Sequence, residues 1–294
     1  MKRISCFIAL ILITRVCVAA PSTEPTHFLR YVEAPDGSAR LESAEATYKN
    51  DAGVVVHLIG AVHIADPEYF AGLNESFDHY DALLYELVKP RDAVPSTQPS
   101  REPSLKWVGN LQRFLRDHLD LVFQLDEIDY DRPNFVHADL DTQSFTEMQA
   151  DRGESMFTLM LRSAMQNMKK SAAKGADVSG LQLLGALFSP DQSRELKRVL
   201  AQQFGDLDDA MDAMEGPNGS VIVGERNKVA LRVMREQIAQ GKKYIGIFYG
   251  AGHLKLMEKS LEEMGYHKVG VSWRTAWDIA PPTPQPATRP SQRF

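Results

Sequence analysis

Cysteine is almost absent from this sequence. Its two cysteines, Cys6 and Cys17, both lie in the segment 1–20, so removal of that segment would leave no thiol at all. That excludes a disulfide framework, a Cys nucleophile and a thiolate metal site. The sequence also lacks an HExxH pair and a G-x-S-x-G elbow, and therefore indicates neither a zincin nor a serine hydrolase.

Positive charge is in short supply. The chain has 33 Lys and Arg against 39 Asp and Glu, a formal net charge of −6. Residues 1–20 contribute Lys2, Arg3 and Arg15 and no acid, so their removal gives −6 − 3 = −9. A surface this acidic argues against nucleic acid as the main partner.

One long apolar run is present, in MKRISCFIALILITRVCVAA. Two basic residues, an apolar stretch and closing small residues are the layout of a secretory signal, so residues 1–20 are predicted to be removed. A secreted or periplasmic protein without a stable membrane span follows. The alternative is a retained N-terminal membrane anchor, but Ile4 to Ala20 is short and Arg15 within it is costly in a bilayer.

The rest of the chain, 44% apolar and 24% charged over all 294 residues, reads as an ordinary globular protein. Short strands are expected between Phe28 and Val62, with a turn at Asn50 to Gly53. Asp66-Pro67 is typical of a helix N-cap and first turn, and the run DALLYELV of a strand covered on both faces. Strand, helix and strand together predict a crossover unit.

A second unit with the same order follows near the carboxyl end. The stretch YIGIFYGAGHLKLMEKSLEEMGYHKVGVSW reads as strand, Gly-x-x-His, helix and strand, and a long helix before it is expected to stop at Gly241. The predicted fold is α/β, with a central mixed, largely parallel sheet built from two related strand-(GxxH)-helix-strand units. The domain covers residues 21–280, and a disordered Pro-rich tail occupies 281–294.

A helical insertion is expected at about 100–218, where apolar residues recur near the helical period. Its predicted helices are Leu105 to Phe123, Gln143 to Met168, Leu181 to Phe188, Asp191 to Phe204 and Leu207 to Met214. NFVHADLD between the first two is a candidate short strand. The many Met residues are interpreted as core packing, with adaptable ligand binding as the alternative.

Polar side chains follow the apolar strands of both units. His63 and His253 are expected at the carboxyl ends of parallel strands, where ligands of open α/β sheets bind, and Glu86 closes the next strand. A satisfied hydrogen bond at a strand end explains one such residue. Two G-x-x-H turns in matching contexts instead predict that these side chains line one cleft.

Four elements in order resemble the TraB/PrgY/GumN family, which includes the Tiki proteins, within the erythromycin esterase-like and ChaN-like superfamily. They are GAVH at Gly60 to His63, YE at Tyr85-Glu86, ERN at Glu225 to Asn227, and GAGH at Gly250 to His253. The resemblance spans about Val54 to Ile279. It implies an α/β fold with a site of His63, Glu86, Arg226 and His253, and Tiki members are described as metal-dependent proteases.

Two schemes of chemistry remain open for these residues. His63, Glu86 and His253 could hold a divalent metal ion that activates water, or His63 could act as a general base with Glu86 orienting it. Arg226 suits an oxyanion or a substrate carboxylate. The predicted substrate is a peptide or a small acyl compound.

A non-catalytic protein of the ChaN-like kind, binding a small ligand or a haem-like group, is the alternative function. His137 and Asp139 would point to the same side of a strand and could join a metal site. A strand end followed by an Asp cap is the favoured interpretation of that pair.

Overall fold

The computed structural model describes residues 26–89, 119–151, 182, 185–186, 188–205 and 221–282. The predicted signal segment, nearly all of the Pro-rich tail and the predicted helix Leu207 to Met214 lie outside the described residues. Much of the other insertion helices lies outside them as well.

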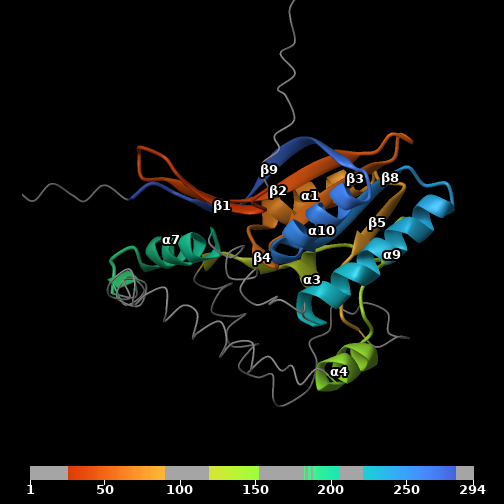
Figure 1. Cartoon of the computed structure of the whole chain (residues 1–294). Coiled ribbons are helices and arrows are strands. Elements are labelled where there is room, and N and C mark those ends of the chain that lie inside the picture. The colour runs from red at the N-terminus through yellow and green to blue at the C-terminus, as the bar shows by residue number, and fades with distance from the viewer. Residues whose placement is uncertain are drawn as a thin grey trace, which may run out of the picture.

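A seven-stranded mixed sheet forms the centre of the molecule (Figure 1). Its order is β1-β2-β3-β8-β5-β7, with β9 paired to β2, and the strands β3, β8, β5 and β7 run parallel. The pairs of β2 with β1, β3 and β9 are antiparallel. The strands are β1 Leu29–Glu33, β2 Ala39–Lys49, β3 Val55–Ala61, β5 Ala82–Tyr85, β7 Phe135–His137, β8 Tyr244–Gly250 and β9 His267–Ile279. The predicted α/β fold is confirmed.

The helices agree with the apolar periodicity where the structure describes them. They are α1 Pro67–Phe77, α3 Gln124–Glu127, α4 Thr142–Asp151, α7 Gln192–Gly205, α9 Arg226–Ala239 and α10 Ala251–Glu263, with a π-helical turn η2 at Val221–Glu225. The prediction of helix up to Phe123 is wrong at its end, because β6, Val122–Phe123, pairs there with β4, Ile64–Ala65. No helix within the described ranges has the length and apolar character needed to cross a membrane.

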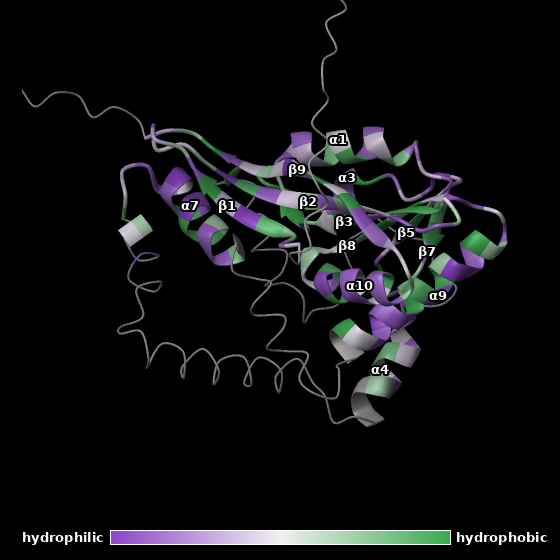
Figure 2. Ribbon diagram, turned by 45° about the horizontal axis from the view of Figure 1, so that its top comes forward, coloured by the Kyte–Doolittle hydropathy of each residue, from purple (hydrophilic) through white to green (hydrophobic). Residues whose placement is uncertain are grey.

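Helices cover both faces of the sheet. The Tyr69 hydroxyl of α1 bonds Ser43, whereas Glu258 of α10 accepts a bond from Tyr48. Because Ser43 and Tyr48 have opposite parity along β2, α1 and α10 lie on opposite faces, as Figure 2 shows. Between them, strands such as β5, whose residues are all buried, form the core.

The two predicted units differ in how they continue. From β3, α1 carries the chain past β8 to β5, so β3 and β5 are not direct neighbours. From β8, α10 carries it in the other direction, to β9 on the far edge of β2. The second unit is therefore not a copy of the first. The connections that leave the adjacent parallel strands β3 and β8 therefore run in opposite directions across the sheet. Such a topological switch point is the usual place for a ligand in an open α/β sheet.

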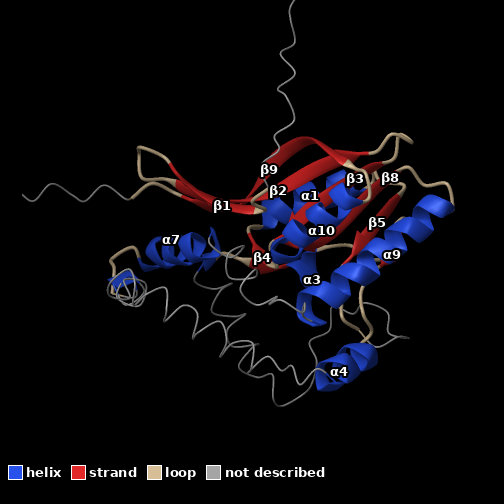
Figure 3. Ribbon diagram, in the orientation of Figure 1, coloured by secondary structure: helices blue, strands red, loops and turns tan. Residues whose placement is uncertain are grey.

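At the start of α1, Pro67 occupies the first turn as predicted, but Asp66 does not cap the helix with its side chain. Its carboxylate instead accepts bonds from Lys197 of α7 and from the backbone of Asp278 in β9, at 2.6 Å each. This contact helps to fix α7 against the β1, β2 and β9 part of the sheet (Figure 3).

Candidate functional site

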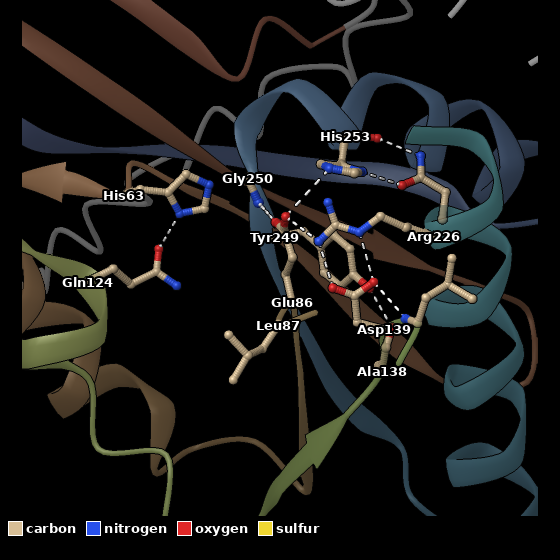
Figure 4. A network of polar contacts seen from close by, with 12 residues as sticks. His63, Glu86, Leu87, Gln124, Ala138, Asp139, Arg226, Tyr249, Gly250 and His253 are labelled. Carbon is tan, nitrogen blue, oxygen red and sulfur yellow. Dashed lines mark hydrogen bonds and ion pairs between the residues drawn. The ribbon is translucent and has the colours of Figure 1, made fainter. Parts of the chain in front are cut away.

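The four residues singled out by the sequence lie at the carboxyl ends of the parallel strands (Figure 4). His63 follows β3, Glu86 follows β5, and His253 lies in the first turn of α10 directly after β8. Arg226 is the first residue of α9. The tertiary structure thus brings their side chains together at the switch point, from four separate elements.

The backbone of Gly250 is where Glu86 and His63 approach the turn between β8 and α10. Its N–H donates to Glu86 Oε2 at 2.5 Å. A Cβ placed on Gly250 would lie 3.2 Å from Glu86 Oε2 and 3.2 Å from His63 Nε2. Any larger residue would therefore require the carboxylate or the imidazole to move by a few tenths of an ångström.

Arg226 forms a buried ion-pair network. Its Nε and Nη2 donate to the two oxygens of Asp139 at 2.8 and 2.6 Å, and Nη2 also donates to Glu86 Oε1 at 2.6 Å. The side chains of Arg226, Glu86 and Asp139 are 10%, 11% and 0% exposed. Most of the guanidinium is therefore committed to holding two carboxylates. Among the described residues, Nη1 is the guanidinium nitrogen without a hydrogen bond to the protein.

Asp139 belongs to this network, which the sequence had not indicated. It accepts from the Leu140 N–H at 2.8 Å, but its main partner is Arg226. The Asp cap is formed by Asp141, whose Oδ1 accepts from the Ser144 N–H at 2.9 Å at the start of α4. His137 does not join it, since its Nε2 lies 2.7 Å from the carbonyl oxygen of Leu87. The pairing of His137 and Asp139 in one metal site is not what the structure shows.

Two amide side chains contact the imidazoles, and neither was singled out from the sequence. Gln124 Oε1 lies 2.9 Å from His63 Nδ1, and Asn227 Oδ1 lies 2.8 Å from His253 Nδ1. Asn227 stands within the ERN motif, which was the only available signal. Gln124 follows a short strand that pairs beside His63, and no local pattern marks it.

The ionisation of the site follows from burial and from these partners. Burial would raise the pKa of Glu86, but attraction to His253, Arg226 and His63 and the Gly250 N–H bond lower it to about 2. Burial lowers the pKa of His253 to about 4, although the negative charge of Glu86 opposes this. At neutral pH the site therefore holds an ionised carboxylate beside an uncharged His253 imidazole.

The donor set fits a divalent metal ion in its chemistry. His253 Nε2 lies 3.6 Å from Glu86 Oε1. If Nε2 carries no proton, its lone pair faces an anionic oxygen, and a cation between the two atoms would relieve that repulsion. Two imidazoles and a carboxylate are ordinary ligands of such ions. The described residues, however, contain no group of three or more His, Cys, Asp or Glu side chains already gathered for a metal.

Comparison of the chain with protein-family models, curated proteins and solved structures gives no match.

Proposed function

We propose that this protein is an exported hydrolase of the TraB/Tiki kind, which cleaves a peptide or related acyl bond at the His63, Glu86, Arg226 and His253 cluster. One observation carries the proposal. Two imidazoles from different elements are held through Nδ1, which leaves Nε2 of each beside one buried, ionised carboxylate. A strand end that served packing alone would gain nothing from this arrangement.

In this proposal, His63 Nε2 takes a proton from the attacking water. The nearby negative charge of Glu86 then stabilises the imidazolium that forms. The Arg226 Nη1 group donates to the developing oxyanion, while its other nitrogens stay on Glu86 and Asp139. In the alternative, metal-dependent scheme, His63 is a ligand and not the base, and a divalent ion held by His63, Glu86 and His253 would supply a bound water of lowered pKa.

The test compares His63→Ala and Glu86→Gln with the parent protein on panels of peptides and esters. Both changes should abolish hydrolysis. His63→Ala should leave folding largely intact, whereas Glu86→Gln also removes a buried charge beside Arg226, so urea unfolding of both variants accompanies the assay. His79→Ala is the matched control, because His79 is exposed and, among the described residues, its Nδ1 contacts the Ser76 carbonyl. Full activity in both site variants would overturn the proposal and favour a binding protein with the same fold.

The role of a metal is tested separately. If His63 and His253 hold an ion, either His substitution should lower the metal content of the purified protein, and a chelator should inactivate the parent. Activity that survives chelation would leave His63 as a metal-independent base.

A further inference from the structure

Each histidine of the site is contacted at two points, its ring and its backbone carbonyl, by one amide residue. The backbone N–H of Gln124 donates to the carbonyl oxygen of His63 at 2.9 Å, and its Oε1 faces His63 Nδ1. Asn227 repeats the pattern on the other imidazole: its Nδ2 donates to the carbonyl oxygen of His253 at 3.0 Å, and its Oδ1 faces His253 Nδ1. The two amide residues belong to different helices, Gln124 to α3 and Asn227 to α9.

The second partner of Asn227 sets the orientation of its amide, because Nδ2 donates to the His253 carbonyl oxygen, which can only accept. Gln124 Nε2 donates to the Tyr130 hydroxyl at 2.8 Å, a group that can also donate. In both residues the amide oxygen faces the ring. An amide oxygen only accepts hydrogen bonds, so Nδ1 of each imidazole must carry the proton.

Burial strengthens this constraint at His253. Gln124, Asn227 and His253 are each 5% exposed, whereas His63 itself is exposed. An unpaired buried donor or acceptor is costly, which ties the tautomer of the His253 ring to Asn227. At His63 the constraint is the hydrogen bond to the buried Gln124 side chain.

We propose that Gln124 and Asn227 are positioning residues that hold His63 and His253 as Nδ1–H tautomers, so that both Nε2 atoms are acceptors beside Glu86. The value of this arrangement for catalysis rests on the proposed hydrolase function. The tautomers themselves are a property of the fold and can be measured without any substrate.

The competing tautomer of His253, with the proton on Nε2, explains why the amide is needed. With the proton on Nε2, the His253 N–H would face Glu86 Oε1, 3.6 Å away, and a small shift of the ring would form a charge-assisted hydrogen bond. Such a ring has no lone pair left for a water proton or a cation. Without an acceptor at Nδ1, the negative charge of Glu86 would favour this Nε2–H tautomer of His253.

The experiment records the ¹⁵N signals of the imidazoles in the chelator-treated protein, which distinguish a protonated from an unprotonated ring nitrogen. In the parent protein, Nδ1 of both rings should be protonated. Gln124→Leu should move His63 to Nε2–H and lower hydrolysis about 10- to 100-fold, the usual loss when a residue that orients an active histidine is removed. Asn227→Leu should do the same for His253.

Conservative variants separate positioning from simple packing. Gln124→Glu keeps an acceptor at His63 Nδ1, and its backbone N–H still bonds the His63 carbonyl, so the Nδ1–H tautomer should return. Asn227→Asp should likewise restore it for His253. Gln143→Leu is the matched control, because Gln143 is exposed on α4 and its partner within the described residues is Glu147.

Nε2–H rings in the parent protein, or tautomers unchanged in both Leu variants, would overturn the inference. Correct tautomers in a protein that hydrolyses nothing would support it and count against the proposed hydrolase alone.

Discussion

At the scale of single residues, the site depends on a guanidinium that neutralises two buried carboxylates. Arg226 contacts Asp139, whose side chain is fully buried, and Glu86, which is nearly so. Replacing such a cation leaves its partners charged in a place where water cannot solvate them.

Arg226→Met should therefore lower the free energy of unfolding by about 3 to 5 kcal/mol, the usual cost of breaking a buried pair on one side. Urea unfolding measures the loss. Arg232→Met on the same helix is the control. Arg232 is exposed and, in the part of the chain that the structure describes, pairs with Glu236, so the loss should be at most about 0.5 kcal/mol. Equal small losses in both variants would contradict a structural role for Arg226.

The same cluster predicts how stability of the metal-free protein depends on pH. His253 has a pKa of about 4 in the folded protein against 6.5 ordinarily, and Glu86 about 2 against 4.5. Both groups bind protons more readily when unfolded, so their stabilisation is complete above about pH 6.5. It should fall as the pH drops, first through His253 between 6.5 and 4 and then through Glu86 between 4.5 and 2.

Unfolding free energies measured from pH 8 to pH 3 check this sign. His253→Gln should flatten the part of the curve between pH 6.5 and 4. A curve with the parent's slope in that range would show that another group is responsible.

At the scale of elements, the turn from β8 into α10 determines how closely the site can assemble. Gly250→Ala should reduce hydrolysis far more than stability, since its Cβ would meet Glu86 Oε2 and His63 Nε2 at 3.2 Å while the strand behind it stays intact. Turnover and urea unfolding on the same samples separate the two effects.

Gly270→Ala in β9 is the control for this substitution, because nothing lies within 4 Å of a Cβ placed there. It should leave turnover unchanged. Equal activity of the Gly250 and Gly270 variants would mean that close approach at Gly250 has no bearing on the chemistry.

At the scale of the whole molecule, the beginning of the described chain is tied to its far end. The N–H and hydroxyl of Thr26 donate to Glu258 at 2.8 and 2.9 Å, and Lys268 bonds both residues. All three are buried. Glu258 lies on α10, the helix that carries His253, so the amino-terminal segment supports the helix of the site.

Deleting the chain through Thr26 should lower stability on the order of 3 kcal/mol, because bonds to a buried carboxylate are lost. A chain that starts at Pro25 keeps Thr26 and is the control. Thermal and urea unfolding compare the two, and equal stability would show that the Glu258 contacts contribute little.

The predicted removal of residues 1–20 has its own measurement. Intact mass of the native protein should correspond to a chain beginning shortly after Ala19 or Ala20, recovered outside the cytoplasm. A chain that still carries Met1 and is found in a membrane fraction would instead support the anchor.

Much of the fold was open to prediction because its signals are local. The apolar runs that became β3, β5 and β8, and the Pro67 that begins α1, act within a few residues. His63, Glu86 and His253 could be chosen for the same reason, since each lies within three residues of the end of such a strand. Gln124 and Asp139 could not, because their partners lie 61 and 87 positions away in the sequence.

The sequence by itself determined which segments are strands and helices and which polar groups stand at strand ends, because hydrophobic period and turn chemistry are properties of neighbouring residues. Only the tertiary structure decided that β8 lies between β3 and β5 and that β9 crosses to β2. It also decided that Arg226 is committed to Asp139, and that amides hold both imidazoles. Those outcomes depend on burial, which makes an unpaired charge or donor costly and so selects partners from anywhere in the chain.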